Sequence, residues 1–179
     1  MHRGSLTYFR KWLNTVFNKV DFHRIKEVGP DRAAAEWLLR CGASVKWKSN
    51  SEWISDYNTL TEKYEGNKMY IEEIDATNSC IMHYGFEYLN GLMYVKSFTL
   101  CKCIYFDDRS IARLSVLKDS LNNLKIISCG NVTDEGILKI AELKKLKYLH
   151  LQDLPEVVNK ENCIDFLREN LPFCKTSFP

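Results

Sequence analysis

Apolar residues recur with a period near 25 in the second half of the chain. Four segments share the pattern apolar-x-x-apolar-x-apolar, and their middle apolar positions, 74, 98, 124 and 149, are separated by 24, 26 and 25 residues. The segments are Ile71-x-x-Ile74-x-Ala76, Val95-x-x-Phe98-x-Leu100, Leu121-x-x-Leu124-x-Ile126 and Leu146-x-x-Leu149-x-Leu151. A fixed period of this length predicts an array of similar units, each with one short strand, that bury their apolar positions against one another.

A small residue follows each strand at a constant distance. Three positions after the last apolar residue stand Ser79, Cys103, Cys129 and Leu154. This is the Asn/Cys position of a leucine-rich repeat, where a small inward side chain satisfies the backbone of a turn. The run Cys-Gly-Asn-Val-Thr-Asp-x-Gly from Cys129 to Gly136 matches the cysteine-containing class, in which Thr-Asp caps the next helix. We therefore predict an α/β fold, a short cysteine-containing leucine-rich-repeat array with a curved parallel sheet and outer helices.

The alternative is a set of ordinary βα units in a doubly wound sheet. That fold needs longer crossovers and a glycine-rich phosphate loop, and the sequence has neither. Helical stretches are instead expected at 107–117 and 134–143, directly after strands. End units of such arrays need caps, which we assign to the N-terminal helices and to residues 161–171.

The N-terminal part differs in pattern from the repeats. Gly29-Pro30 interrupts the chain, and a helix is predicted from Asp31 to Arg40 with Gly42 as its C-cap. Residues 48–68 are polar and weakly periodic, which predicts a connector with one helical turn around 53–57. The predicted organisation is an N-terminal helical region over 1–68 and a repeat domain of about four units over 69–179.

The first twenty residues combine an apolar stripe with positive charge. Leu6, Phe9, Leu13, Val16, Phe17 and Val20 follow helical spacing, and no acidic residue precedes Asp21. The basic residues are Arg3, Arg10, Lys11 and Lys19. Three interpretations fit and do not exclude one another: a remnant of a mitochondrial targeting segment, a helix lying on an anionic membrane, and a helix packed on the domain.

Residues between the inward apolar positions project from the concave face of such an array. Those predicted to bind a partner are Glu73, Asp75, Thr99, Lys125, Tyr148 and His150, with Ser97 and Asn123 beside them. The face runs from acidic to basic along the array. A mixed polar surface of this kind also fits simple solvation, but repeat arrays commonly bind partners here.

The composition excludes some classes of protein but does not indicate a function. The net charge of the 179 residues is +2, which gives no reason to expect a nucleic-acid partner, and we expect a monomer. No apolar run approaches the roughly 18–20 residues needed to span a bilayer. Seven cysteines without a secretory signal favour free thiols in a reducing compartment.

Two of these cysteines form a Cys101-Lys102-Cys103 motif. A zinc site would need further paired ligands, and the histidines are scattered. The repeat register makes Cys103 a buried turn residue and leaves Cys101 facing outward as the candidate reactive thiol. No Walker loop, Gly-x-Ser-x-Gly or His-Glu-x-x-His motif occurs, so we expect no enzymatic activity.

Several segments together resemble the mitochondrial ATP synthase coupling factor B family, whose members are also called subunit s or distal membrane-arm assembly component-like proteins. The resemblance covers nearly the whole chain. Its clearest segments are Trp12–Asp21, Val28–Ala43, Ile74–Thr77, Leu100–Cys103 and Ile126–Asn131.

The resemblance implies a function and a location. It implies a peripheral protein on the matrix side of the mitochondrial inner membrane, associated with the membrane sector of ATP synthase and supporting proton-driven ATP synthesis. It also implies that the thiols of Cys101 and Cys103 matter for activity, and that Mg²⁺ binds backbone oxygens at the positions of Gly42 and Thr77. Two other functions stay open: assembly of the membrane arm of respiratory complex I, and protein recognition by a repeat adaptor.

The chain departs from the family at its start. Arg10 and Lys11 replace an aromatic-glycine pair, which shifts the first helix towards a basic character. Membrane contact through this helix is then expected to depend more on lipid charge. The longer presequence of the family is short or absent here, so mitochondrial import follows from the resemblance.

Overall fold

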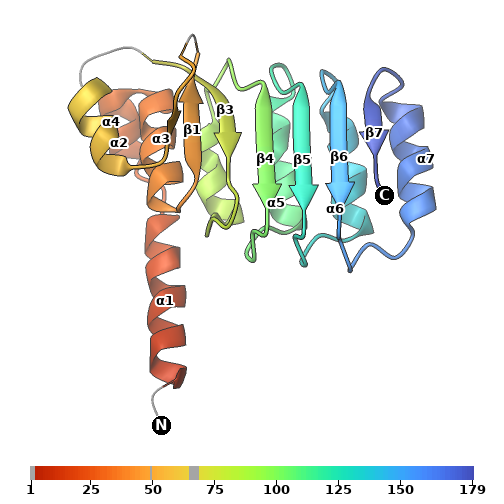
Figure 1. The fold of residues 1–179 in the computed structure, drawn as a ribbon, viewed down its shortest axis with the longest axis horizontal. Coiled ribbons are helices and arrows are strands. Elements are labelled where there is room, and N and C mark those ends of the chain that lie inside the picture. Colours follow the sequence, from red (N-terminus) through yellow and green to blue (C-terminus); the bar gives the residue numbers. More distant parts are fainter. Residues whose placement is uncertain (1–2, 49, 65–68) are drawn as a thin grey trace.

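The computed structural model describes residues 3–48, 50–64 and 69–179, without the side chains of 3–8, 10 and 61–64. Arg3, Leu6 and Arg10 of the predicted basic stripe therefore lie outside the described side chains, as does the predicted boundary at 68. The described residues form one seven-stranded sheet in the order β2-β1-β3-β4-β5-β6-β7, with helices on one face (Figure 1). The strands are β1 (Ser44–Trp47), β2 (Trp53–Ile54), β3 (Ile71–Asp75), β4 (Ser97–Cys101), β5 (Asn123–Ile127), β6 (Tyr148–Gln152) and β7 (Lys175–Ser177).

Strands β3 to β7 are parallel, and their register follows the sequence period. Ile74 pairs with Phe98, Phe98 with Leu124 and Leu124 with Leu149, so the middle apolar positions of the four segments form one row. All twelve apolar positions of the pattern are buried. The predicted strand register is confirmed, because a period near 25 places equivalent residues on neighbouring strands.

Strands β3, β4, β5 and β6 each end in the same turn. The described non-glycine residues with positive φ are Asn78, Lys102, Ser128 and Asp153, all between 52° and 57°. The amide groups of the first three donate to the next strand, for instance Lys102 N–H to the Ile127 carbonyl at 2.9 Å. Asparagine and aspartate tolerate this left-handed conformation better than most residues, and two of the four turns use them. The turn is thus repeated with the period.

The two predicted helices that cover the sheet begin within one residue of their predicted starts, and each continues as a 3-10 helix. The predicted helix 107–117 consists of α5 (Asp108–Arg113) followed by a 3-10 turn, and 134–143 divides in the same way. Asp107 caps α5 by accepting from Ser110 N–H at 3.0 Å, and Thr133 caps α6. The remaining elements here are η1 (His83–Leu89), η2 (Leu114–Leu117), α6 (Asp134–Lys139), η3 (Ile140–Glu142) and α7 (Lys160–Asn170).

The connector predicted at 48–68 is partly wrong. Its predicted helical turn at 53–57 is instead strand β2, whose Ile54 pairs with Val45 of antiparallel strand β1, and a helix, α4 (Tyr57–Tyr64), follows. Burial of Ile54 against the sheet edge outweighs the weak local pattern of the segment. Because β1 also pairs with β3, the sheet continues across the predicted division between 1–68 and 69–179.

Helix α3 (Pro30–Arg40) carries the apolar side of the N-terminal part. It starts one residue before the predicted Asp31, and Gly42 follows its C-cap with φ of 83°. A second helix that the sequence pattern did not indicate, α2 (Phe22–Val28), is joined to it by the ion pair from Arg24 to Glu36. Arg32, one turn before Glu36 on α3 itself, forms a second ion pair with the same carboxylate. Burial alone would raise the pKa of Glu36, but these two arginines hold it below its usual value.

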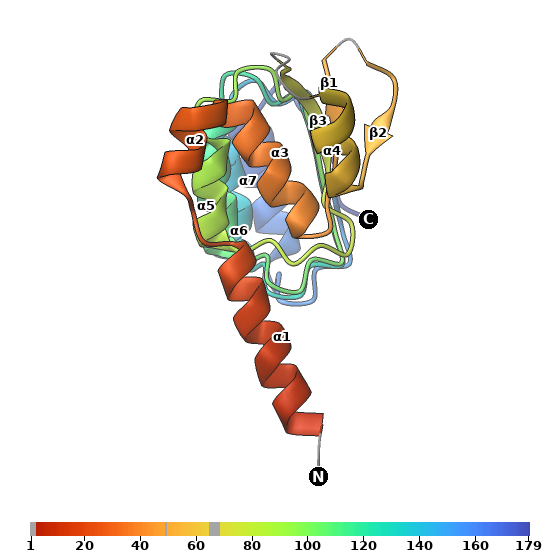
Figure 2. The same cartoon turned by 90° about the vertical axis from the view of Figure 1, so that its left-hand side faces the viewer.

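Helix α1 (Arg3–Phe17) projects from the body of the molecule (Figures 1 and 2). Among the described side chains of its apolar stripe, Phe17 and the following Val20 pack on the core. Phe9 and Trp12 stack on each other at 5.9 Å and stay 58% and 60% exposed. In the part of the chain that the structure describes, no helix has the length and apolar character needed to cross a membrane.

Candidate functional site

The sheet has one covered face and one open face. Helices α5, α6 and α7 lie on the first, as Figure 2 shows along the sheet. We call the other the open face and define it by the side chains of β3–β7 that point away from those helices. Burial alternates along the strands accordingly, with Phe98 and Leu100 buried and Ser97, Thr99 and Cys101 partly exposed. Each residue predicted to bind a partner lies on the open face: Glu73, Asp75, Thr99, Lys125, Tyr148 and His150.

The acidic end of the open face is matched within the molecule. Glu73 on β3 accepts from the Lys46 ammonium group on β1 at 2.7 Å. Asp75 accepts from the amide and the hydroxyl of Thr77, at 2.9 and 2.6 Å. The sequence pattern gave no sign of the Lys46 contact, because β1 was not predicted as a strand.

The opposite end carries exposed cations. Lys125 lies beside His150, and Tyr148 lies beside Lys175, as partners across neighbouring parallel strands. The His150 ring Nε2 and the Gln152 side-chain oxygen are 3.1 Å apart. Lys175 belongs to β7, a strand of three residues that is too short for a periodic pattern to reveal. The basic end therefore contains one more lysine than predicted.

The two candidate thiols differ in surroundings, as the repeat register predicts. Cys103 is fully buried and donates its thiol hydrogen to the Ala76 carbonyl at 2.8 Å. The adjacent Cys129 thiol and burial both raise the pKa of Cys103. Cys101 is partly exposed on the open face, paired with Ile127 on β5. All seven cysteines are free thiols.

The two cysteines should differ in their rate of alkylation. We expect N-ethylmaleimide to modify Cys101 about 100-fold faster than Cys103, because reaction at Cys103 requires a local opening that costs about 3 kcal/mol. Peptide mapping after timed exposure of the folded protein measures both rates. The Cys101→Ser variant is the control, and fast labelling of Cys103 in native protein would contradict the burial.

The two positions matched to a magnesium site lie at one end of the sheet. Ser44 pairs with Asp75, which brings the residues just before β1 and just after β3 together, Gly42 and Thr77 among them. Backbone carbonyls there and the Asp75 carboxylate are hard oxygen donors of the kind Mg²⁺ prefers, so the residues fit the ion. Among the described residues, no three His, Cys, Asp or Glu side chains form a cluster able to hold a metal.

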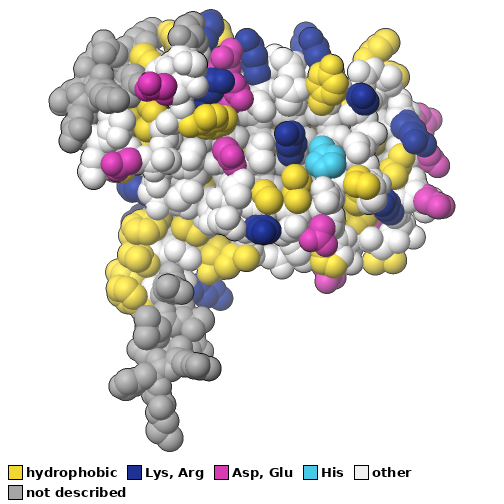
Figure 3. Space-filling view, viewed as in Figure 1, with side chains coloured by type: hydrophobic (Ala, Val, Ile, Leu, Met, Phe, Trp, Pro, Cys, Tyr) yellow, Lys and Arg dark blue, Asp and Glu magenta, His cyan; other side chains and the backbone are white. Residues whose placement is uncertain are grey.

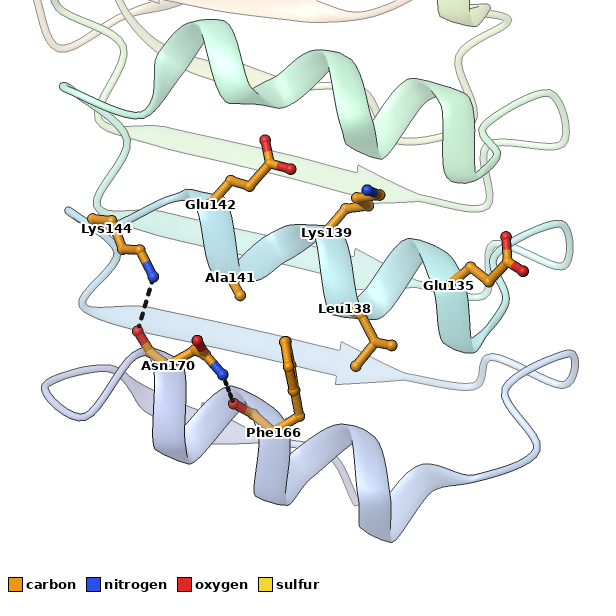
Figure 4. Close-up of a pocket in the computed structure, with 8 residues that line it drawn as sticks. All are labelled: Glu135, Leu138, Lys139, Ala141, Glu142, Lys144, Phe166 and Asn170. Atoms are coloured by element: carbon orange, nitrogen blue, oxygen red, sulfur yellow. Dashed lines mark hydrogen bonds between the residues drawn. The ribbon is translucent and has the colours of Figure 1, made fainter.

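An apolar hollow of about 570 Å³ lies between the outer helices and was not predicted. Leu138 of α6 and Phe166 of α7 point towards each other across it (Figure 4). The Lys144 ammonium group donates to the Asn170 carbonyl at 3.3 Å at one end. Both apolar residues are more than one third exposed. In the sequence they look like ordinary residues of outer helices, so nothing there indicates the hollow.

The fold and the open face define a class: an α/β protein with a mostly parallel sheet, covered on one side and offering polar side chains on the other. No protein-family model matches the chain. It is 51% identical over 172 residues to ATP synthase subunit s, mitochondrial, of Rattus norvegicus, and 49% identical to the protein of that name in Homo sapiens. Both alignments cover 92% of this chain and 84% of the relative.

The chain belongs to the family of mitochondrial ATP synthase subunit s. A more distant relative is Distal membrane arm assembly component 2 of Drosophila melanogaster, at 26% identity over 93% of this chain and 62% of the relative.

Proposed function

We propose that this chain is a non-catalytic, monomeric coupling factor associated with the membrane sector of mitochondrial ATP synthase. The observation that carries the proposal is identity near 50% over 92% of the chain with relatives named as a subunit of that enzyme. In this proposal the protein is peripheral on the matrix side of the inner membrane, and it supports ATP synthesis driven by proton flow.

The open face is the proposed contact surface. Its support is the placement of Thr99, Lys125, Tyr148 and His150 side by side on neighbouring strands. We further propose that the parallel sheet is a short leucine-rich-repeat array whose N-terminal helices cap one end. The aligned apolar rows, the buried residues at 79, 103, 129 and 154, and the repeated left-handed turn support this assignment.

Complexome profiling on native gels tests the proposed association. Tagged protein in mitochondria should migrate with ATP synthase, with the Lys139→Glu variant of the outer helix α6 behaving like wild type. Migration confined to membrane-arm intermediates of complex I would favour the second candidate, an assembly factor, for which the Drosophila relative gives the observation. A free pool outside both complexes would rule out both functions.

We propose that helix α1 contacts the inner-membrane surface. Phe9, Trp12 and Val16 are exposed, and so are Lys11 and Lys19 close by. Aromatic and basic side chains on one helix bind the interface of anionic bilayers.

Trp12→Ala should lower partitioning onto anionic vesicles about tenfold or more, because it removes the large exposed indole ring. Flotation with vesicles of phosphatidylcholine and cardiolipin measures the bound fraction. Phe173→Ala, which removes an exposed ring far along the chain, is the control and should bind as wild type. Equal losses for both variants would exclude a specific contact through α1.

We also propose that Mg²⁺ binds at Gly42 and Thr77. Such an ion, when bound, would supply positive charge that links the start of β1 to the end of β3. A concentration of about ten times the dissociation constant should raise the melting temperature by about 2–4 °C. The Asp75→Asn variant should reduce that shift, and an equal shift in Na⁺ of matched ionic strength would overturn the site.

A further inference from the structure

Positive charge on the open face is not balanced by acid on the same half. Strands β4–β7 place eleven residues on this face and none is Asp or Glu. They are Ser97, Thr99, Cys101, Asn123, Lys125, Ile127, Tyr148, His150, Gln152, Lys175 and Ser177. Figure 3, which views this face, shows dark blue and cyan side chains over β5 and β6, with magenta at the rim of this half.

The acidic residues at the β3 end of the face differ from these lysines. They have partners: Glu73 has Lys46, Asp75 has Thr77, and the neighbouring Glu72 accepts from Lys96 at 2.6 Å. Lys125 and Lys175 have no ion pair within the part of the chain that the structure describes. Lysines without an ion pair on this face are available to a partner.

The spacing of these groups suits a short extended segment. Neighbouring strands lie about 4.8 Å apart and alternate residues on one strand about 7 Å apart. By these spacings, the backbone positions of Lys125 and His150 lie about 5 Å apart, and those of Lys125 and Lys175 lie about 12 Å apart. Carboxylates at alternate positions of an extended peptide lie about 7 Å apart, which is within the range that the flexible lysine side chains can reach.

Tyr148 provides an apolar contact at the centre of these basic residues. Its ring is 57% exposed, and it lies between Asn123 and Lys175 on the neighbouring strands. Tyrosine is among the residues that contribute most to binding at protein interfaces, because it buries a rigid ring and keeps a polar tip. A membrane is a poorer match, since the stacked and exposed pair Phe9 and Trp12, which suits lipid, lies on α1, away from this face.

We propose that the half of the open face formed by β5–β7 binds an acidic segment of a protein partner. Lys125 and Lys175 receive its carboxylates, His150 adds a third donor, and Tyr148 packs against its aliphatic or aromatic side chains. The inference deepens the proposed function, since it gives the chemistry of the segment that the face contacts in the partner complex.

The test uses fluorescein-labelled octaglutamate peptide and purified full-length protein, with fluorescence anisotropy as the readout. Wild type should bind, and binding should weaken as salt increases. The double variant Lys125→Glu/Lys175→Glu should weaken binding about tenfold or more. Tyr148→Ala should weaken binding to an otherwise identical peptide with one central tyrosine more than binding to octaglutamate.

The matched control is Lys139→Glu/Lys144→Glu, which makes the same charge change on the outer-helix side. Equal loss for the two double variants would overturn the inference, because net charge alone would explain it. It would also be overturned by absent peptide binding, or by lysine-dependent binding only to anionic vesicles.

Complexome profiling separates this inference from the proposed function. Reduced co-migration of Lys125→Glu/Lys175→Glu with ATP synthase, with the control double variant unaffected, supports the acidic-segment site. Normal co-migration of both double variants overturns the site and leaves the coupling-factor function standing. If wild type does not co-migrate, the coupling-factor function fails, while the peptide experiment still decides the site.

Discussion

Alanine in place of Phe98 is expected to lower the free energy of unfolding by about 3–5 kcal/mol. The side chain is 0% exposed and occupies the central row of the sheet, between Ile74 and Leu124. Its ring stacks against that of Phe86 in η1 with 6.3 Å between the centroids. Removing it leaves a cavity between the sheet and its covering layer, which rigid neighbouring strands cannot close.

The loss should be measured by urea denaturation followed by circular dichroism. Val116→Ala is the control, because this η2 side chain is 41% exposed and should cost less than about 1 kcal/mol. A domain of this size has a stability of about 5–15 kcal/mol, so the Phe98 variant comes close to unfolding. A loss below about 1 kcal/mol would show that Phe98 does not connect the sheet to its helices.

The sequence predicts the parallel sheet well because the apolar pattern of each strand is short and recurs in four copies. Ile74, Phe98, Leu124 and Leu149 mark one row, and each copy of the pattern strengthens the register of the others. The same register predicts that Cys103 is buried and Cys101 is not. These predictions need only the period and the direction of side chains along a strand.

The missed elements depend on pairing with a neighbouring strand and not on a pattern of their own. Strand β2 consists of two residues and exists because Ile54 pairs with Val45, while β7 is three residues added to the far edge. Neither is long enough to show a period. The ion pair between Lys46 and Glu73 follows from the missed β1, so the electrostatics of the open face were predicted only where the strands were.

Alanine in place of Asn18 is expected to lower the free energy of unfolding by about 2–5 kcal/mol and to release helix α1 from the body. The residue is 0% exposed at the end of α1. Its side-chain oxygen accepts from Met82 N–H at 2.7 Å and from the indole N–H of Trp37 at 3.2 Å. Its amide nitrogen donates to the Cys80 carbonyl at 2.9 Å.

The energetic reason is that two buried partners, Trp37 and Met82, and the partly buried Cys80 lose their hydrogen bonds at once. Each unsatisfied buried donor or acceptor costs about 1–3 kcal/mol. A substitution at Gly85, which packs against Trp37 and Asn18, tests the same junction. A Cβ there would lie 2.6 Å from the Trp37 indole nitrogen and 2.7 Å from the Asn18 oxygen, so Gly85→Ala should also weaken the junction.

Limited proteolysis separates loss of the junction from general instability. Trypsin should cut after Lys19 faster in the Asn18→Ala protein than in wild type, at temperatures where the sheet remains folded by circular dichroism. Asn90→Ala is the control, since its exposed side chain bonds only to the nearby Glu87 among the described contacts. If cleavage after Lys19 is unchanged, α1 is held by the apolar packing of Phe17 and Val20 instead. If cleavage rises and the variant also binds anionic vesicles less well, the fixed position of α1 is needed for membrane contact, because a released helix must be ordered again on binding.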